Sequence, residues 1–161
     1  MAKPYGYPTK FIATSNVKEY RETIPYWVNE DDVVLEIGCE WGTTSELIAP
    51  RCKELIATDL SEECVARART ERPELRFETL DVFNIRKALA FDRQFTKIYI
   101  DVSGFSGFRS LLDVIGLLQM YASVFEPEAI IIKSNSLKRF AAGCMPWSLK
   151  RAKQEAGLEK E

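Results

Sequence analysis

The sequence predicts an α/β domain built on a doubly wound, mainly parallel sheet. Short apolar runs rich in branched side chains alternate five times with helix-like segments, and the links between them are short. This alternation implies right-handed crossovers that cover both faces of a sheet with helices. Four of the five runs end in an ionisable residue, namely Asp59, Asp81, Asp101 and Lys133. The carboxyl ends of parallel strands meet at one edge, where such sheets bind ligands.

Composition is consistent with one domain spanning residues 1–161, of which 46% are hydrophobic and 29% charged. We expect residues 1–8 to form a loose N-terminal arm. The net charge of −2 supplies no global basic field that would attract nucleic acid. The chain has no histidine, which removes the commonest general base and argues against a metal site. Scattered cysteines and the lack of an apolar signal segment predict a cytoplasmic protein.

The first predicted helix runs from Ser15 or Asn16 to Trp27, because capping residues precede apolar side chains at helical spacing. The apolar run 33–37 is typical of a strand buried on both faces. A helix from Thr43 to about Pro50 follows it, and its hydroxyl and acidic residues form a capping pattern. The order of these three elements places the central strand early in the chain.

The remaining elements follow from the same signals. Ser61 and the acids after it begin a helix that ends before Pro73. We expect strands at 55–58, 75–80, 95–100 and 129–132, and helices at 61–72, 84–90, 108–125 and about 146–156. Short turns join them, so the chain has no second domain.

Two glycines flank a turn between the central strand and the next helix, in the order Glu36-Ile-Gly38-Cys-Glu40-Trp-Gly42. We call residues 38–42 the glycine turn. Backbone without a side chain lets a ligand approach closely, and the free N–H groups of a helix start attract anions. The glycine turn therefore predicts a nucleotide-type binding site.

These residues resemble the class I S-adenosylmethionine (SAM)-dependent methyltransferases, which have a Rossmann-like fold. The resemblance spans about residues 33–133 and implies the strand order 3-2-1-4-5. Sheets of this family normally add two further strands after the last helix, and the sequence leaves no room for them. We therefore expect an exposed sheet edge, or one that is covered by another copy of the chain or by a partner subunit.

The resemblance also implies how SAM would bind. Glu36, Gly38 and Gly42 would hold its methionine end, and Asp59 would accept both ribose hydroxyls. Glu40 departs from the small residue that the family usually has, and adds a ligand for the amino group. The implied SAM-binding residues are Glu36, Gly38, Glu40, Gly42, Asp59, Leu60, Asp81 and Val82. A dinucleotide site is not the leading interpretation, because the G-x-G-x-x-G spacing is absent.

The acceptor chemistry rests on a second, narrower resemblance. Asp101 and Lys133, each at a strand end, are similar to part of the Lys–Asp–Lys set of FtsJ-like and fibrillarin-like RNA 2′-O-methyltransferases. Lys18, on the helix before the central strand, matches the first lysine of that set. A ribose hydroxyl is a weak acid, so a base or a cation beside it is needed. RNA is thus one candidate acceptor; a small molecule, a protein, or a regulatory SAM-binding role that needs a partner are the alternatives.

Overall fold

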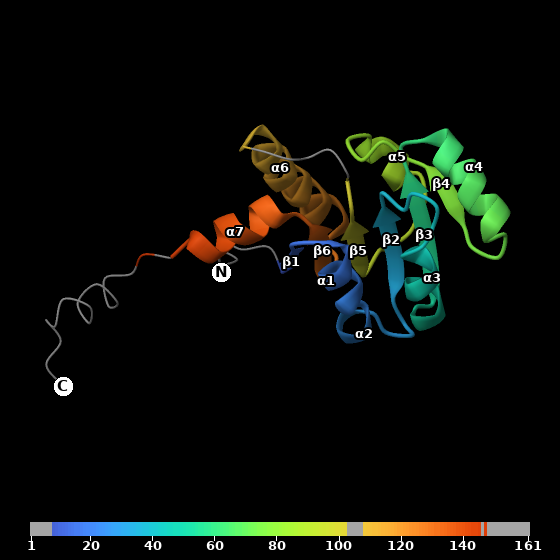
Figure 1. The fold of residues 1–161 in the computed structure, drawn as a ribbon, viewed down its shortest axis with the longest axis horizontal. Coiled ribbons are helices and arrows are strands. Elements are labelled where there is room, and N and C mark those ends of the chain that lie inside the picture. Colours follow the sequence, from blue (N-terminus) through green and yellow to red (C-terminus); the bar gives the residue numbers. More distant parts are fainter. Residues whose placement is uncertain (1–7, 103–107, 146, 148–161) are drawn as a thin grey trace, which may run out of the picture.

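The computed structural model describes residues 8–102, 108–145 and 147, and these form an α/β fold around one sheet (Figure 1). Six strands, all parallel, make up this sheet in the described part of the chain. They are β1 (Lys10–Thr14), β2 (Val33–Ile37), β3 (Glu54–Asp59), β4 (Phe77–Thr79), β5 (Lys97–Ile100) and β6 (Ala129–Lys133). Their spatial order is β1-β6-β5-β2-β3-β4.

The five predicted strands are all present, as β2 to β6. Counted among themselves they lie in the predicted order 3-2-1-4-5, with β2 at the centre. Ile37, near the end of β2, pairs with Thr58 of β3 on one side and Ile100 of β5 on the other. The carboxyl ends of these strands therefore meet at one edge, as expected for a parallel sheet.

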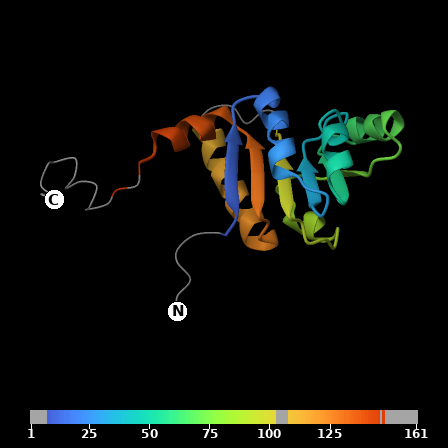
Figure 2. The ribbon, with the colours of Figure 1, turned by 90° about the horizontal axis from the view of Figure 1, so that it is seen from below.

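The sixth strand, β1, was missed from the sequence. It pairs with β6 along its whole length, from Lys10 opposite Ala129 to Thr14 opposite Lys133. Figure 2 shows the two strands side by side. The chain's own N-terminal strand therefore covers the edge of β6, which the sequence analysis had left open, and β1 becomes the edge strand. Covering of the sheet edge by another subunit stays a prediction.

The helices largely follow the predicted pattern. They are α1 (Val17–Glu22), α2 (Ile24–Trp27), α3 (Ser45–Ile48), the 3₁₀ turn η1 (Ala49–Arg51), α4 (Glu62–Glu71), α5 (Ile85–Leu89), α6 (Phe108–Phe125) and α7 (Asn135–Gly143). The first predicted helix is split, because the backbone N–H of Thr23 closes α1 just before Pro25 begins a new turn. No helix in the described segments is both long and apolar enough to cross a bilayer.

Helix α7 was also missed. The side chain of Ser134 caps it by accepting from the backbone N–H of Leu137 at 3.2 Å. Lys133 thus stands one residue before a helix start. The arm at residues 1–7 and nearly all of the predicted helix 146–156 lie outside the described residues.

The side chains of the strands alternate between two apolar clusters, one on each face of the sheet. Leu35 and Ile37 of β2 pack with residues of α5 and α6 on one face. Val34 belongs to the other cluster, together with residues of α1 to α4. Glu36 shares the face of Val34, because strand side chains alternate with a period of two. The fold therefore places a carboxylate under α1 and α3.

Candidate functional site

The glycine turn crosses directly over the end of β5. Gly38 has φ +84° and Gly42 has φ +87°, values that favour glycine. A Cβ on Gly38 would lie 1.8 Å from the backbone oxygen of Asp101, and one on Gly42 would lie 2.7 Å from the Phe77 ring. Both glycines are therefore required by packing within the chain. Close approach of a ligand, the reason inferred from sequence, is not needed to explain them.

Glu40 adopts the left-handed conformation at φ +51° without being glycine. Its backbone N–H donates to Oδ2 of Asp59 at 2.9 Å, and the N–H of Ser61 donates to Oδ1 of the same carboxylate at 2.9 Å. Asp59 thus ties the turn to the end of β3. A carboxylate offers roughly four acceptor positions, so Asp59 retains acceptor capacity for ligand hydroxyls.

Arg72, at the end of α4, holds the turn from outside. Its guanidinium donates to the backbone oxygen of Trp41 at 2.8 Å and to the Glu46 carboxylate at 2.9 Å. Arg67 lies over the Trp41 ring at 3.8 Å. The sequence analysis missed both arginines, because nothing in their spacing links α4 to a turn some thirty residues earlier. The turn is therefore fixed on its outer side.

Glu36 is buried, with 1% of its surface exposed. The hydroxyl of Ser45 donates to its carboxylate. Burial raises the pKa of Glu36 to about 7, the carboxylates of Asp101 and Asp59 add to this rise, and Ser45 and the charge of Arg21 oppose it. Near neutral pH this carboxyl group is consequently divided between its protonated and ionised forms.

The structure brings Asp101 and Lys133 together, as predicted. The Lys133 ammonium lies 2.7 Å from Oδ1 of Asp101. The side chains are 28% and 17% exposed, so the pair is within reach of solvent. They stand at the ends of the neighbouring strands β5 and β6, beside the glycine turn.

Lys18 does not join that pair. Its side chain is 85% exposed and lies 3.9 Å from Glu22 on the same helix. Instead α1 contributes Arg21, whose Nε donates to the Thr44 hydroxyl at 3.0 Å, and Tyr20, which is 1% exposed. From the sequence, Tyr20 is predicted only as one of the apolar residues at helical spacing in this helix, and not as a site residue. A catalytic role for Lys18 stays a prediction.

The remaining predicted residues lie at the same edge, at the ends of β3 and β4. Leu60 is 68% exposed beside Asp59. Asp81 is exposed, and its Oδ1 accepts from the N–H of Phe83 at 3.0 Å. Val82 is buried, and its backbone oxygen accepts from the Tyr121 hydroxyl at 2.9 Å. Leu60 and Asp81 therefore present an apolar surface and an acid at the same edge as Asp59.

A family model described as a methyltransferase domain matches residues 34–114, half of the chain. This protein belongs to that methyltransferase family. The match includes the glycine turn and Asp101, and it ends before Lys133. A search of the curated proteins finds no match.

Solved structures show the same fold as this methyltransferase domain. A dimethyladenosine transferase from Plasmodium falciparum matches at 17% identity with a TM-score of 0.58, over 80% of this chain and 46% of that one. Streptomyces venezuelae DesVI matches at 17% identity with a TM-score of 0.55, over 71% of this chain and 48% of that one. The chain thus spans about half the length of these proteins.

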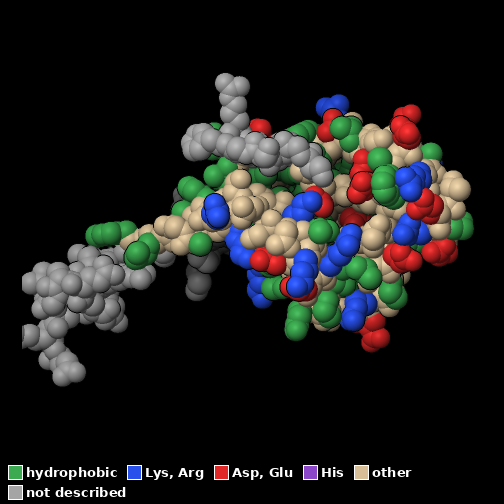
Figure 3. Space-filling view, in the orientation of Figure 1, with side chains coloured by type: hydrophobic (Ala, Val, Ile, Leu, Met, Phe, Trp, Pro, Cys, Tyr) green, Lys and Arg blue, Asp and Glu red, His purple; other side chains and the backbone are tan. Residues whose placement is uncertain are grey.

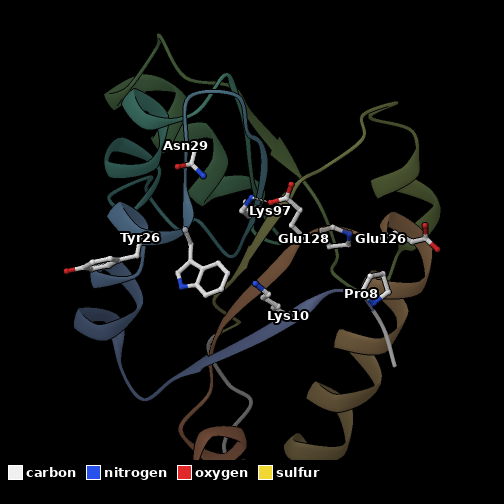
Figure 4. Close-up of a pocket in the computed structure, with 9 residues that line it drawn as sticks. Pro8, Lys10, Tyr26, Asn29, Lys97, Glu126 and Glu128 are labelled. Carbon is white, nitrogen blue, oxygen red and sulfur yellow. Dashed lines mark hydrogen bonds and ion pairs between the residues drawn. The ribbon is translucent and has the colours of Figure 1, made fainter. Parts of the chain in front are cut away.

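One hollow lies at the amino edge of the methyltransferase domain, at the opposite end of the sheet from the glycine turn (Figure 4). It measures about 490 Å³, and Lys10, Trp27, Lys97 and Glu128 are among its lining residues. None of the predicted SAM-binding residues lines it. We therefore assign this hollow to the amino edge of the sheet, which supports the fold, and not to the predicted SAM site.

The groups at the carboxyl edge suit a ligand that carries positive charge. The carboxylates of Glu36, Asp59 and Asp101 lie near enough to one another to influence the pKa of Glu36. The buried hydroxyl of Tyr20 has no hydrogen-bond partner within the described part of the chain. The methionine end of SAM carries a sulfonium and an ammonium, so these residues fit it.

Proposed function

We propose that the chain is a SAM-dependent methyltransferase and that its acceptor is a 2′-hydroxyl of RNA. Bound SAM would supply a methyl group already activated by the adjoining sulfonium. Membership of the methyltransferase family supports the transfer itself. The Lys133–Asp101 pair, 2.7 Å apart beside the glycine turn, is the observation that carries the choice of acceptor.

In this proposal the chain binds SAM along the carboxyl edge. Glu36 and the glycine turn hold the methionine end, where an ionised carboxylate is attracted to the ligand's positive charge. Asp59 accepts from the ribose hydroxyls with the capacity left over from its two backbone contacts. Leu60 offers apolar surface to the adenine ring, and Asp81 accepts from the adenine amino group.

Asp101 and Lys133 would act on the acceptor. Asp101 accepts the proton that the attacking hydroxyl loses, and the Lys133 ammonium beside it stabilises the negative charge on that oxygen. The ion pair also orients both side chains, which lowers the entropy cost of reaching the reactive arrangement. A partly exposed position suits a pair that must meet a large acceptor.

Exposed basic side chains on α1 and α7 support a phosphate-bearing acceptor. Lys18 on α1 and Lys138 and Arg139 on α7 are exposed. Figure 3 shows Lys and Arg side chains over α1, with Asp and Glu side chains among them. Lysine and arginine contacts to phosphates position nucleic acid without reading its sequence. These basic groups are local, in a chain whose net charge is −2, and two of them also contact carboxylates: Lys138 lies 2.7 Å from Glu19, and Lys18 lies 3.9 Å from Glu22.

The test is transfer of labelled methyl from SAM to cellular RNA, protein and small-molecule fractions. We expect label in RNA ribose, and a decrease of about 100-fold or more in Lys133→Ala, the effect typical of losing a proton-transfer or charge-stabilising group. Lys53→Ala is the matched control, because Lys53 is an exposed lysine before β3. Calorimetry should give the same SAM affinity for both variants.

The fractions also separate the alternative acceptors. Label found only in protein or in small molecules would replace the RNA proposal with one of those alternatives. SAM binding with no transfer to any fraction would favour a regulatory subunit. Full RNA methylation by Lys133→Ala would show that the Asp101–Lys133 mechanism is wrong.

A further inference from the structure

Tyr20 and Tyr99 form a buried pair with unequal hydroxyl groups. Their rings meet edge to face, with centroids 5.3 Å apart and an angle of 73°. The Tyr99 hydroxyl lies 3.1 Å from the Thr23 hydroxyl. The Tyr20 hydroxyl has no partner among the residues that the structure describes. A buried polar group without a hydrogen-bond partner destabilises the folded protein, so the position of the Tyr20 hydroxyl requires an explanation.

The Tyr20 ring packs beside Glu36. Its neighbour Tyr99 lies opposite Glu36 where β5 pairs with β2, and side chains at paired positions share one face of the sheet. The Tyr20 hydroxyl is therefore buried near the end of β2, where the methionine end of SAM is proposed to bind. Burial raises the pKa of Tyr20 well above its usual value, and the charges of Glu36 and then Asp101 raise it further.

Glu36 is short of donors in its ionised form. Ser45, from α3, is the donor recorded for it in the described part of the chain. An ionised carboxylate accepts about four hydrogen bonds, and two or three stabilise its charge. The charged groups around Glu36 are Arg21 from α1, Asp59 from β3 and Asp101 from β5, and Lys133 from β6 is paired with Asp101. Negative charge thus prevails around Glu36.

We propose that Tyr20 is a positioning residue of this site, whose hydroxyl donates to Glu36 when a cationic ligand ionises that carboxylate. This inference rests on the proposed function, because SAM is the ligand that brings the positive charge. Within the described part of the chain the Tyr20 hydroxyl has no other partner. The ionised carboxylate then has two hydroxyl donors, Ser45 from α3 and Tyr20 from α1.

The experiment compares Tyr20→Phe with Tyr99→Phe, a matched pair that removes one hydroxyl each from neighbouring buried rings. Calorimetry measures the affinity for SAM and for methylthioadenosine, which shares the adenine and ribose but lacks the positive charge. We expect Tyr20→Phe to weaken SAM binding about tenfold or more, as for a hydrogen bond to a charged group. Methylthioadenosine should change by less than about twofold, a difference too small to reflect a lost hydrogen bond.

Two further readouts separate positioning from structural support. Thermal unfolding of ligand-free Tyr20→Phe should be no easier than that of the wild type, because no hydrogen bond is lost, whereas Tyr99→Phe loses its bond to Thr23. SAM affinity of the wild type should increase as the pH rises through about 7, where Glu36 ionises. In Tyr20→Phe that increase should occur at higher pH.

The outcomes distinguish the two proposals. Unchanged SAM affinity in Tyr20→Phe, with normal binding by the wild type, would overturn this inference and leave the proposed function standing. Equal losses for SAM and methylthioadenosine would show a purely structural role and would also overturn it. A wild-type protein that binds no SAM would refute the proposed function, and this inference with it.

Discussion

The two edges of the sheet bury charged groups in different ways. At the amino edge Lys97 is 3% exposed, and its ammonium lies 2.8 Å from Asp32 and 2.6 Å from Glu128. Asp32 also accepts from the Thr96 hydroxyl at 2.6 Å and from the N–H of Asn29 at 2.7 Å. Every charge in this network has partners that offset the cost of its burial.

At the carboxyl edge the buried groups are incompletely paired. Glu36 is 1% exposed with Ser45 as its recorded donor, and the Tyr20 hydroxyl has no partner in the described residues. Left-handed backbone does not distinguish the edges, because Glu40 at this edge shares it with Asp92 and Glu126 at the amino edge. Incomplete pairing of buried groups is tolerated where a ligand completes the site. We conclude that the amino edge stabilises the fold, whereas the carboxyl edge is suited to binding a ligand.

The largest expected effect comes from Gly38→Ala, which breaks the contact between the glycine turn and β5. The new Cβ would lie 1.8 Å from the Asp101 backbone oxygen, and φ is +84°. We expect a loss of more than about 5 kcal/mol or failure to fold, because neither backbone can move without separating two central strands. Urea unfolding measures this loss. Gly116→Ala, with nothing within 4 Å of the added Cβ, is the control and should be neutral or stabilising.

Next is Lys97→Met, which removes one partner from the amino-edge network. It leaves the Asp32 carboxylate buried without its cation, and we expect a loss of about 3–5 kcal/mol in the free energy of unfolding. Lys133→Met makes the same change at the other edge. There we expect only about 1 kcal/mol, because Lys133 and Asp101 are partly exposed. Equal losses in the two variants would contradict the difference between the edges.

The smallest effect concerns pH. The folded protein favours protonated Glu36, since its pKa is about 7 against the usual 4.5, so the unfolded chain binds fewer protons between these values. The free energy of unfolding therefore falls by up to about 3 kcal/mol as pH rises through this range. Glu36→Gln should remove this dependence, as shown by thermal unfolding from pH 4 to 8. An identical pH profile in both proteins would mean that Glu36 is not the group responsible.

Asp32 should behave in the opposite way. Burial alone would raise its pKa, but hydrogen bonds from Lys97 and Thr96 hold the pKa of Asp32 below its usual value of 3.8. Its contribution to stability is present above that pH and is lost as the pH falls further. The two edges thus lose stability at opposite ends of the pH scale.

Five strands and most of the helices could be predicted from the sequence, because their apolar runs are continuous and their caps are typical. Strand β1 could not, since only Thr14 of its five residues is fully buried and its apolar run, Phe11-Ile-Ala13, is only three residues long. Helix α7 has apolar residues at helical spacing, Leu137, Phe140 and Ala141, but it is only nine residues long and none of them is buried, so its signal in the sequence is short. Strand β1 depends on its pairing with β6, which lies more than a hundred residues later in the chain. Helix α7 depends on contacts with α6, which no local sequence pattern reveals.

The site residues likewise divide into those that could be predicted from the sequence and those that could not. Glu36, Asp59, Asp81 and Asp101 were predicted because strand ends share an edge in any parallel sheet. Lys18 was chosen by spacing along the chain, which cannot tell that its side chain points into solvent. Tyr20 was passed over because a tyrosine at an apolar helix position has the pattern of an ordinary core residue.

The sequence by itself determined the fold class and the edge at which the acids gather, because strand periodicity and crossover handedness are local rules with few solutions. The strand order followed from the resemblance to class I methyltransferases. Only the tertiary structure decided how each of those acids is partnered. It fully pairs the charges at one edge and leaves Glu36 and the Tyr20 hydroxyl short of partners at the other. Pairing depends on the direction of each side chain after packing, and that direction is set by neighbours that are distant in the chain.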